Sequence, residues 1–506
     1  MVSTRARLGR WLRGASPTRA VVGLALGGAC GIIPLVGLGC SRPGVSADSN
    51  PIAPQPPPGG IAVQPWVTSG DQNKLLSREP LVYFTNETAA SPMIDVDEST
   101  RYQSMLGFGG AITDATAYLI QEKMSADQRE SLLQDLFGRS TGIGLSFTRL
   151  PMGASDFSLR QYSYDDMPLG STDSTLTHFS IDADRTDKLP VLKRALTINP
   201  QLTVMATPWS PPGWMKSTSS LIQGTLLPQW YDSFAQYFVK FIRAYAAEGV
   251  TVAAITVQNE PNFEPADYPG MRLEARARAR VIGDHVGPAL AAAGLQTEIW
   301  DWDHNWDVPQ SPLTVLADTV APRYVQGVAW HCYNGDVGAQ LVVHDAYPAK
   351  DTYFTECSGG DWATNFADNL VYDIGTLVIG ATRNWARSVA LWNLALDEHD
   401  GPHTGGCANC RGVVTITSTT GMYHRNVEYF ALAQASKFVR PGALRIASSS
   451  GVTAISSVAF RNEDDGSKVL IVLNGATSSQ RFGVRSAGKA FSYTLPAKSV
   501  ASFVWN

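Results

Sequence analysis

The chain has 506 residues, which is long enough for one (β/α)8 barrel and a small companion domain. Apolar residues make up 44% of the sequence, so a large buried core can form. The formal net charge at pH 7 is −5 and the lysines and arginines form no stripe, which argues against nucleic acid as a partner.

Residues 1–40 have the pattern of an export signal. Basic residues precede a Gly-rich apolar run from Val21 to Gly39, and no acidic residue occurs in the segment. Because Pro34 and glycines interrupt this run, we interpret it as a signal peptide of an exported protein. Cys40 is a candidate for lipidation, which would anchor the protein to the outer face of a membrane. Gly37 stands where lipoprotein signals usually carry Leu, so a freely secreted protein is the alternative.

Residues 41–60 are rich in Pro, Gly and Ser and are expected to form a linker. Residues 61–100 contain short β-type runs such as Leu81 to Phe84. These runs cannot bury a face alone, so we expect them to join a β domain formed by the other end of the chain.

Residues 101–438 alternate short apolar runs with amphipathic helical stretches. Eight strands are predicted, at 106–112, 143–151, 202–207, 252–258, 296–301, 325–331, 352–356 and 387–393. Helices are predicted between them at 125–137, 182–198, 231–248 and 273–293. This pattern predicts an α/β fold, a (β/α)8 TIM barrel, with a doubly wound parallel sheet as the alternative.

The pattern changes after Pro441. Residues 439–506 contain runs of alternating polarity, including Val452 to Phe460 and Val469 to Leu473, separated by turn residues. They predict an antiparallel β-sandwich domain that flanks the barrel and includes the strands of residues 61–100.

Two glutamates stand directly at the ends of predicted barrel strands. Glu260 follows the fourth strand, and Glu356 ends the seventh. The C-terminal ends of barrel strands meet at one face, so these carboxyl groups are expected to face each other there. Cleavage of a glycoside needs such a pair, one to protonate the leaving oxygen and one to attack the anomeric carbon or activate water. The alternative is that each glutamate only caps a following helix.

Other polar and aromatic side chains also follow the predicted strands, as expected for a cleft that binds a sugar. They are Asp114, Arg149, Asp156, Trp209, Trp214, Asp301, Trp302, Asp303, His331, Tyr333, Trp392 and Asn393.

The cysteines and local motifs give no support for a metal or a cofactor. Cys407 and Cys410 are expected to form a local disulfide in an exported protein, with a zinc site that includes His399 and His403 as the alternative. Cys332 and Cys357 are expected to be free, buried thiols. The chain has no HExxH zinc motif, dinucleotide-binding or P-loop motif, or serine nucleophile elbow, so no metal and no cofactor are expected.

An ordered series of motifs resembles glycoside hydrolase family 30, the family of lysosomal glucocerebrosidase. The motifs are GFGGAITDA at 107–115, RLPMGASDFS at 149–158, TPWSPPGWMK at 207–216, TVQNEP at 256–261, HCY at 331–333, TECSGG at 355–360 and ALWNLAL at 390–396. The resemblance covers the whole predicted barrel and, more weakly, the flanking β domain.

The resemblance implies roles for individual residues. Glu260 is similar to the family's acid/base and Glu356 to its nucleophile, while Asn259 resembles the amide that binds the 2-hydroxyl. The residues that resemble those contacting the glycone or lying near the nucleophile are Asp114, Trp209, Trp392, His331 and Tyr333. Arg149 is expected to lie beneath the nucleophile and to keep it ionised.

The expected activity is retaining hydrolysis of β-D-glucosidic bonds by double displacement, of the glucosylceramidase type. An endo-β-1,6-glucanase acting on polysaccharide is the alternative within the family, and a non-catalytic carbohydrate-binding surface lipoprotein is the alternative outside it. A hydrolase that uses a metal in the loop of Cys407 and Cys410 is a third. The substrate is accordingly a β-glucoside, a glucan or glucosylceramide, and loops 262–272 and 397–412 are expected to decide between them.

Overall fold

The computed structural model describes residues 57, 59–449 and 454–506. The predicted signal segment, Cys40 and nearly all of the predicted linker lie outside these residues. Within the described part of the chain, no helix is both long and apolar enough to cross a membrane.

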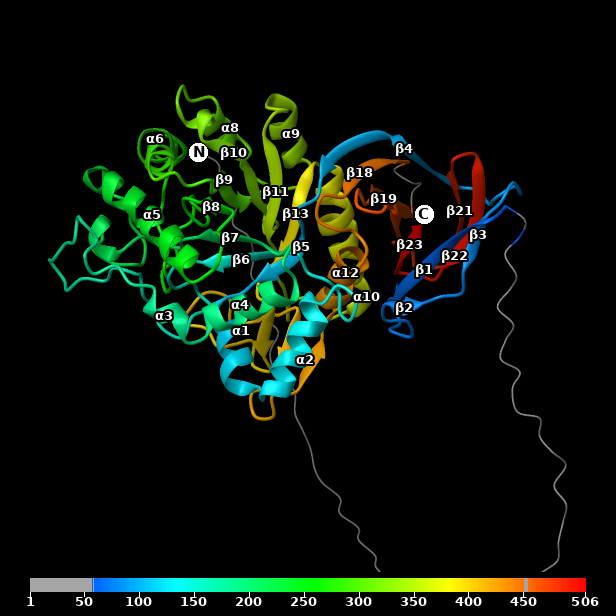
Figure 1. Cartoon of the computed structure of the whole chain (residues 1–506), viewed down its shortest axis with the longest axis horizontal. Coiled ribbons are helices and arrows are strands. Elements are labelled where there is room, and N and C mark those ends of the chain that lie inside the picture. Colours follow the sequence, from blue (N-terminus) through cyan, green and yellow to red (C-terminus); the bar gives the residue numbers. More distant parts are fainter. Residues whose placement is uncertain (1–56, 58, 450–453) are drawn as a thin grey trace, which may run out of the picture. The chain divides into compact units, whose positions relative to one another are not determined.

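Eight parallel strands close into a barrel, which confirms the predicted TIM barrel and excludes an open doubly wound sheet (Figure 1). In chain order they are β5 (Gly107–Ala111), β6 (Phe147–Pro151), β7 (Thr203–Thr207), β8 (Ala254–Thr256), β9 (Glu298–Asn305), β10 (Val325–His331), β11 (Asp351–Glu356) and β13 (Ala386–Leu391). The strands lie where alternation of apolar runs and helices placed them. The fifth is longer than predicted and runs on to Asn305, which brings His304 into the strand.

The connecting helices surround this barrel (Figure 1). The α-helices are α1 (Asp114–Tyr118), α2 (Ala126–Phe137), α3 (Asp182–Arg185), α4 (Lys188–Ile198), α5 (Tyr231–Ala247), α6 (Ala275–Arg280), α7 (Gly287–Ala292), α8 (Gln310–Leu316), α9 (Ala339–Ala346), α10 (Phe366–Tyr372), α11 (Ala381–Arg383) and α12 (Val427–Ser436). Wider π-helical turns are η1 (Leu119–Lys123), η4 (Val281–Val286) and η6 (Asp373–Gly380), and short 3-10 turns are η2 (Gly213–Met215), η3 (Pro228–Trp230) and η5 (Ala321–Arg323).

Local sequence explains where these helices begin and break. Ser125 and Gln128 form a reciprocal capping box at the start of α2. The single helix predicted over 182–198 is divided into α3 and α4, because Pro190 lacks an N–H and belongs in the first turn of a helix. Pro288 occupies the same kind of position in α7, after the π-helical turn η4.

The β domain is one ten-stranded sheet with contributions from both ends of the chain. Its strands are β1 (Ile61–Ser69), β2 (Ser77–Arg78), β3 (Val82–Phe84), β4 (Met93–Ser104), β18 (Leu444–Ser448), β19 (Ile455–Arg461), β20 (Lys468–Asn474), β21 (Gln480–Ser486), β22 (Lys489–Leu495) and β23 (Ser499–Trp505). A β-bridge between Thr85 and Ala490 joins the two ends of the sheet, so that it folds over itself as a sandwich.

The alternating sequence of the C-terminal strands buries both faces of the sheet. Ala459, Leu470 and Phe503 belong to the core inside the sandwich. Their strand neighbours Phe460 and Ile471 instead belong to the core shared with the barrel.

Polar contacts reinforce this junction between the barrel and the sandwich. Gln434 of α12 donates to Thr68 Oγ1 at 2.8 Å and accepts from Ser502 Oγ at 2.6 Å. The barrel and the sandwich therefore share one packed interface.

Two small sheets form in the loops that follow the C-terminal ends of the barrel strands. They comprise β12 (Gly359–Gly360) paired with β15 (Cys410–Arg411), and β14 (Ala395–Asp397) with β16 (Val414–Ile416) and β17 (Tyr423–Arg425). The pairing of β12 with β15 brings the loop after Glu356 against the loop that contains Cys407.

Two disulfides lie at this end of the barrel. The expectation that Cys332 and Cys357 are free thiols is wrong, because they form a disulfide with a Cα–Cα distance of 5.3 Å. These residues follow β10 and β11, which are adjacent in the barrel, so chain positions 25 residues apart become neighbours. Cys407 and Cys410 form the second disulfide, which leaves no free thiolate there for zinc.

We expect the double variant Cys332→Ser/Cys357→Ser to lose about 3.5 kcal/mol of unfolding free energy, because a long loop is no longer closed in the unfolded chain. The matched double variant Cys407→Ser/Cys410→Ser opens a far shorter loop and should lose about 2 kcal/mol. Equilibrium denaturation in urea without reductant measures both values. Equal losses in the two variants would contradict this ranking.

Candidate active site

The C-terminal ends of the barrel strands surround a cleft of about 430 Å³. Its lining includes Asp156, Trp209, Asn259, Glu260, Phe263, Asp267, Tyr268, Tyr333, Glu356, Trp362, Trp392 and the disulfide of Cys407 and Cys410. Both loops expected to select the substrate, 262–272 and 397–412, contribute to its walls. They also meet each other, since Gly406 N–H donates to Asp267 Oδ2 at 3.2 Å.

Glu356 is the last residue of β11 and is 5% exposed. Its Oε2 accepts a hydrogen bond from Arg149 Nη1, and its Oε1 accepts one from the Tyr333 hydroxyl at 2.8 Å. A cation and a hydroxyl donor thus hold the two oxygens of this carboxylate in place, which suits a nucleophile.

Arg149 lies in β6 beneath the cleft and is completely buried. Its Nη2 donates to Asn259 Oδ1 at 2.7 Å and to Asp303 Oδ2 at 2.8 Å. The guanidinium carbon is also 4.9 Å from the Trp209 ring centre and 5.6 Å from that of Trp392. Arg149 therefore positions the amide of Asn259 and the carboxylates of Asp303 and Glu356. Of these contacts, the sequence predicted the one with Glu356.

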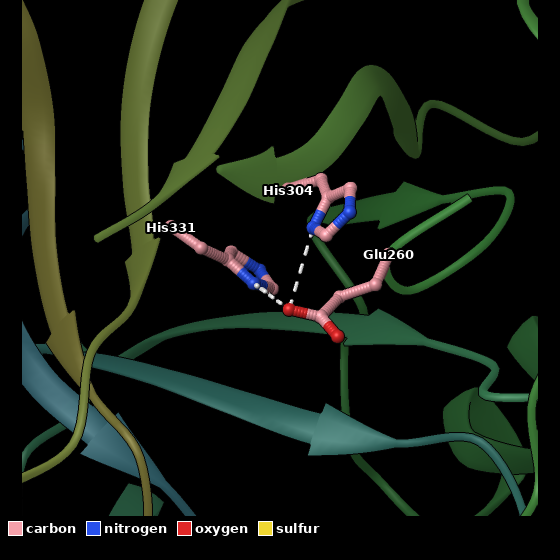
Figure 2. A group of neighbouring side chains, drawn as sticks. All are labelled: Glu260, His304 and His331. Carbon is pink, nitrogen blue, oxygen red and sulfur yellow. Dashed lines mark hydrogen bonds and ion pairs between the residues drawn. The ribbon is translucent and has the colours of Figure 1, made fainter. Parts of the chain in front are cut away.

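Glu260 follows β8, and its carboxylate lies between two histidines (Figure 2). Its Oε1 is 3.2 Å from His331 Nδ1 and 3.3 Å from His304 Nδ1. The residue has a φ of +47°, which is rare for a side chain of this size and directs the carboxylate into the cleft. Its N–H donates to the carbonyl of Asp303 at 3.0 Å, which helps to hold this conformation.

Charges around Glu260 and His331 set the resting protonation of the site. Burial opposes the charge on Glu260, but His304 and His331 outweigh it and lower the pKa of Glu260. Burial also opposes the charge on His331, yet Glu356, Asp303 and Glu260 together raise the pKa of His331 to about 9. These contacts therefore favour a charged His331 ring beside an ionised Glu260 carboxylate.

Trp209 and Trp392 form a stacked pair in the wall of the cleft. Their ring centres are 5.1 Å apart with an interplanar angle of 22°, and each residue is 3% exposed. Trp362, Phe263 and Tyr333 are more open, at 57%, 46% and 44% exposed. The cleft thus combines a buried aromatic wall with exposed aromatic rings, an arrangement that suits sugar rings.

Asp114, which the sequence placed among the residues that hold the sugar, is not among the side chains that line this cleft. Its carboxylate is 2.9 Å from Lys188 Nζ and also accepts hydrogen bonds from Ser158 and from the Tyr162 hydroxyl. It lines a separate small pocket together with Lys188 and Tyr162. Asp114 is therefore engaged by a buried ion pair with Lys188.

Asp156, by contrast, is one of the side chains that line the cleft. It is 7% exposed, and its Oδ1 is buried without a hydrogen-bond partner among the described residues. Burial and the charges of Glu356 and Glu260 raise the pKa of Asp156 well above its usual range. Its place in the motif RLPMGASDFS was visible in the sequence, but its orientation depends on how the loop after β6 packs.

The chain matches the family model described as the glycosyl hydrolase family 30 TIM-barrel domain over residues 105–439. The chain belongs to glycosyl hydrolase family 30. The family's β-sandwich domain matches residues 442–503. The resemblance seen in the motifs is therefore confirmed, and the protein is an O-glycosyl hydrolase.

The similar proteins include endo-1,6-β-glucanases and glucosylceramidases. The endo-1,6-β-D-glucanase of Neurospora crassa is 38% identical over 75% of this chain and 81% of its own. The lysosomal acid glucosylceramidase of Mus musculus is 28% identical over 83% of this chain and 84% of its own. Among solved structures, the endo-β1,6-glucanase BT3312 has a TM-score of 0.81 and 34% identity, covering 88% of this chain and 99% of that one.

We expect Asp156→Asn to lower kcat/KM on an aryl β-glucoside by about 100-fold, because a substrate hydroxyl loses a buried carboxyl partner. Asp114→Asn is the matched control and should change kcat/KM less than about threefold. It should lower the unfolding free energy by about 2 kcal/mol, because the buried Lys188 loses a charged partner. Steady-state kinetics and urea denaturation measure these effects. A larger kinetic loss for Asp114→Asn would reverse the assignment.

Proposed function

We propose that this family 30 enzyme is an endo-β-1,6-glucanase that acts by retaining double displacement. The observation that carries the mechanism is the pair of carboxyl groups in one cleft with contrasting surroundings. Glu356 is held by a buried guanidinium and is proposed as the nucleophile. Glu260 is held by imidazole groups and is proposed as the acid/base.

The spacing of the two carboxylates supports retention. His331 Nδ1 lies 3.2 Å from Glu260 and 3.9 Å from Glu356, so one ring nitrogen spans both groups. The two facing oxygens can be no farther apart than these two distances combined, which is compatible with the separation of about 5–5.5 Å between the carboxyl groups of retaining enzymes. Direct attack by Glu356 is therefore the step that we propose.

In the first step, Glu356 attacks the anomeric carbon while Glu260 protonates the leaving oxygen. The proton can reach Glu260 from His331 through the 3.2 Å contact. A sugar that fills the cleft excludes water and further opposes the charge on Glu260, which favours that transfer. In the second step, Glu260 accepts a proton from water, which attacks the glycosyl ester and restores Glu356.

The cleft residues divide the binding of the sugar. Asn259, fixed by Arg149, is proposed to bind the 2-hydroxyl, and Asp156 is proposed to bind another hydroxyl with its unpaired oxygen. Trp209 and Trp392 would pack against the same ring. The exposed Trp362 and Phe263 offer platforms for further sugar units of a polymer.

The relatives favour the glucanase over the leading expectation of a glucosylceramidase. Both the fungal enzyme and the solved structure with a β-1,6-glucanase name are more similar to this chain than the mouse glucosylceramidase. The pattern of residues 1–40 supports action outside the cell, where such a polymer would be met. A lipid tether at Cys40 remains part of the proposal, with the secreted form as its alternative.

Glu356→Ala should lower kcat/KM on β-1,6-glucan by more than about 10⁴-fold, because no covalent intermediate can form. Glu260→Ala should lower kcat/KM on β-1,6-glucan by about 10²–10⁴-fold. Azide should restore the turnover of an activated aryl glucoside by this variant, because azide attacks the glycosyl ester in place of water. Glu264→Ala is the matched control and should keep the wild-type activity. Glu264 lies in the loop that follows Glu260 and is paired with Arg272. Ordinary activity in Glu356→Ala would refute the proposed nucleophile.

Wild-type protein should shorten β-1,6-glucan chains before free glucose accumulates, because the exposed Trp362 and Phe263 are proposed to bind further sugar units of the polymer. Chain length by size-exclusion chromatography and product anomers by NMR test this, with β anomers expected first. Faster hydrolysis of glucosylceramide than of β-1,6-glucan would favour the glucosylceramidase activity instead, and release of glucose alone would exclude endo action.

A further inference from the structure

Three side chains with metal-binding atoms meet at one side of the cleft. Glu260, His304 and His331 each contribute one donor atom, and these atoms all lie within 4.8 Å of one another (Figure 2). They come from the ends of β8, β9 and β10, which are consecutive strands of the barrel. Glu260 and His331 are 71 positions apart in the sequence, so no local sequence motif joins them.

The distances around Glu260 match those between the ligands of a tetrahedral ion. Its Oε1 is 3.2 Å from His331 Nδ1 and 3.3 Å from His304 Nδ1. Bonds of about 2.0–2.1 Å to a tetrahedral zinc ion place neighbouring ligands about 3.3–3.4 Å apart. Two of the three ligand edges therefore already have the required length, and the third, between the two histidine nitrogens, is no longer than 4.8 Å.

His304 supplies a second, independent observation. The residue is only 9% exposed, and its Nδ1 has no hydrogen-bond partner among the described residues. The same nitrogen faces the Glu260 carboxylate (Figure 2) in an ion-pair contact at 3.3 Å that lacks hydrogen-bond geometry. When the His304 ring is neutral with its proton on Nε2, the Nδ1 lone pair on this side is a donor that a metal ion would satisfy.

The surroundings resemble those of an established kind of metal site. His331 Nε2 is 3.0 Å from Asp303 Oδ1, the carboxylate–histidine arrangement that orients a ligand imidazole toward a metal. Glu260 lines the cleft, so an ion has a path from solvent and a free fourth position there. Two nitrogen donors and one carboxylate favour Zn²⁺ and similar first-row ions over Mg²⁺ or Ca²⁺.

We propose that Glu260, His304 and His331 bind one Zn²⁺ or a similar transition-metal ion, and that this ion inhibits the enzyme. A carboxylate bound to the metal cannot protonate the leaving oxygen, and the ion would also occupy part of the cleft. The binding half of the proposal stands on the three side chains alone. The inhibition half rests on the proposed role of Glu260 as the acid/base.

Binding is tested with the full chain after removal of metal by a chelator and of the chelator by gel filtration. Titration with Co²⁺ should give the visible absorption of a tetrahedral ion at one equivalent per chain, and Zn²⁺ should displace it. His304→Ala should weaken Zn²⁺ binding at least about 100-fold, because loss of even an outer-shell partner costs 10–100-fold. His424→Ala, which removes an exposed histidine of β17, is the matched control and should bind as the wild type does.

His304→Gln is the second variant, should His304→Ala fail to fold. A wild type that binds no stoichiometric ion, or a folded His304 variant that binds as tightly as the wild type, would overturn the site. Circular dichroism and thermal unfolding establish which variants are folded.

Inhibition is measured as the rate of each protein with Zn²⁺ relative to its own metal-free rate. At a free Zn²⁺ concentration ten times the dissociation constant, wild-type turnover should fall about tenfold and recover with chelator. The rate ratio of His304→Ala should stay near one. If the ion binds and the rate of hydrolysis does not fall, the proposed inhibition is wrong. If the folded, metal-free wild type hydrolyses no β-glucoside, the proposed function is wrong, and the binding result still stands.

Discussion

The cleft depends on the buried charge of Arg149. A guanidinium without solvent contact would cost several kcal/mol unless it were paired, and here Glu356 and Asp303 supply the opposite charge. Its partners follow or belong to β8, β9 and β11, while Arg149 itself is in β6. One cation therefore fixes the ends of four barrel strands relative to each other. The positions of Glu356 and Asn259 are a consequence of this electrostatic requirement.

The same network reaches the second glutamate through a chain of contacts. Asp303 accepts from Arg149, is also held by the hydroxyls of Thr256 and Thr355 at 2.7 Å each, and contacts His331. His331 in turn contacts Glu260. Two residues of the same type thus have opposite environments, a fixed cation beside Glu356 and titratable imidazoles beside Glu260. This asymmetry, more than the identity of the residues, would give them the different roles proposed for them.

Sequence patterns were sufficient for the fold because each depends on local periodicity. Apolar strands alternating with amphipathic helices required a parallel sheet, and the C-terminal runs of alternating polarity required a sheet with two packed faces. Glu260, Glu356, Trp209 and Trp392 could be placed in the cleft because strand ends meet at one face of a barrel.

The remaining features depend on packing across the fold. Asp114 and Asp156 both follow predicted strands, and only the buried partner Lys188 shows that Asp114 is already paired. Cys332 and Cys357 became neighbours through the adjacency of β10 and β11. The sequence did not predict that His304 lies near Glu260, because β9 continues beyond the predicted end of that strand and includes His304.

The proposed metal site and the proposed acid/base function have a common origin. A group that exchanges a proton during turnover must keep lone pairs accessible inside a largely buried cleft, and neighbouring imidazoles must be able to share that proton. Lone pairs arranged in this way around Glu260 are also suited to a metal ion, because the proton and the ion use the same donor atoms. A substrate that fills the cleft would compete with the ion for the space beside Glu260. Sensitivity to transition metals would then be a direct physical cost of the geometry that permits acid/base catalysis.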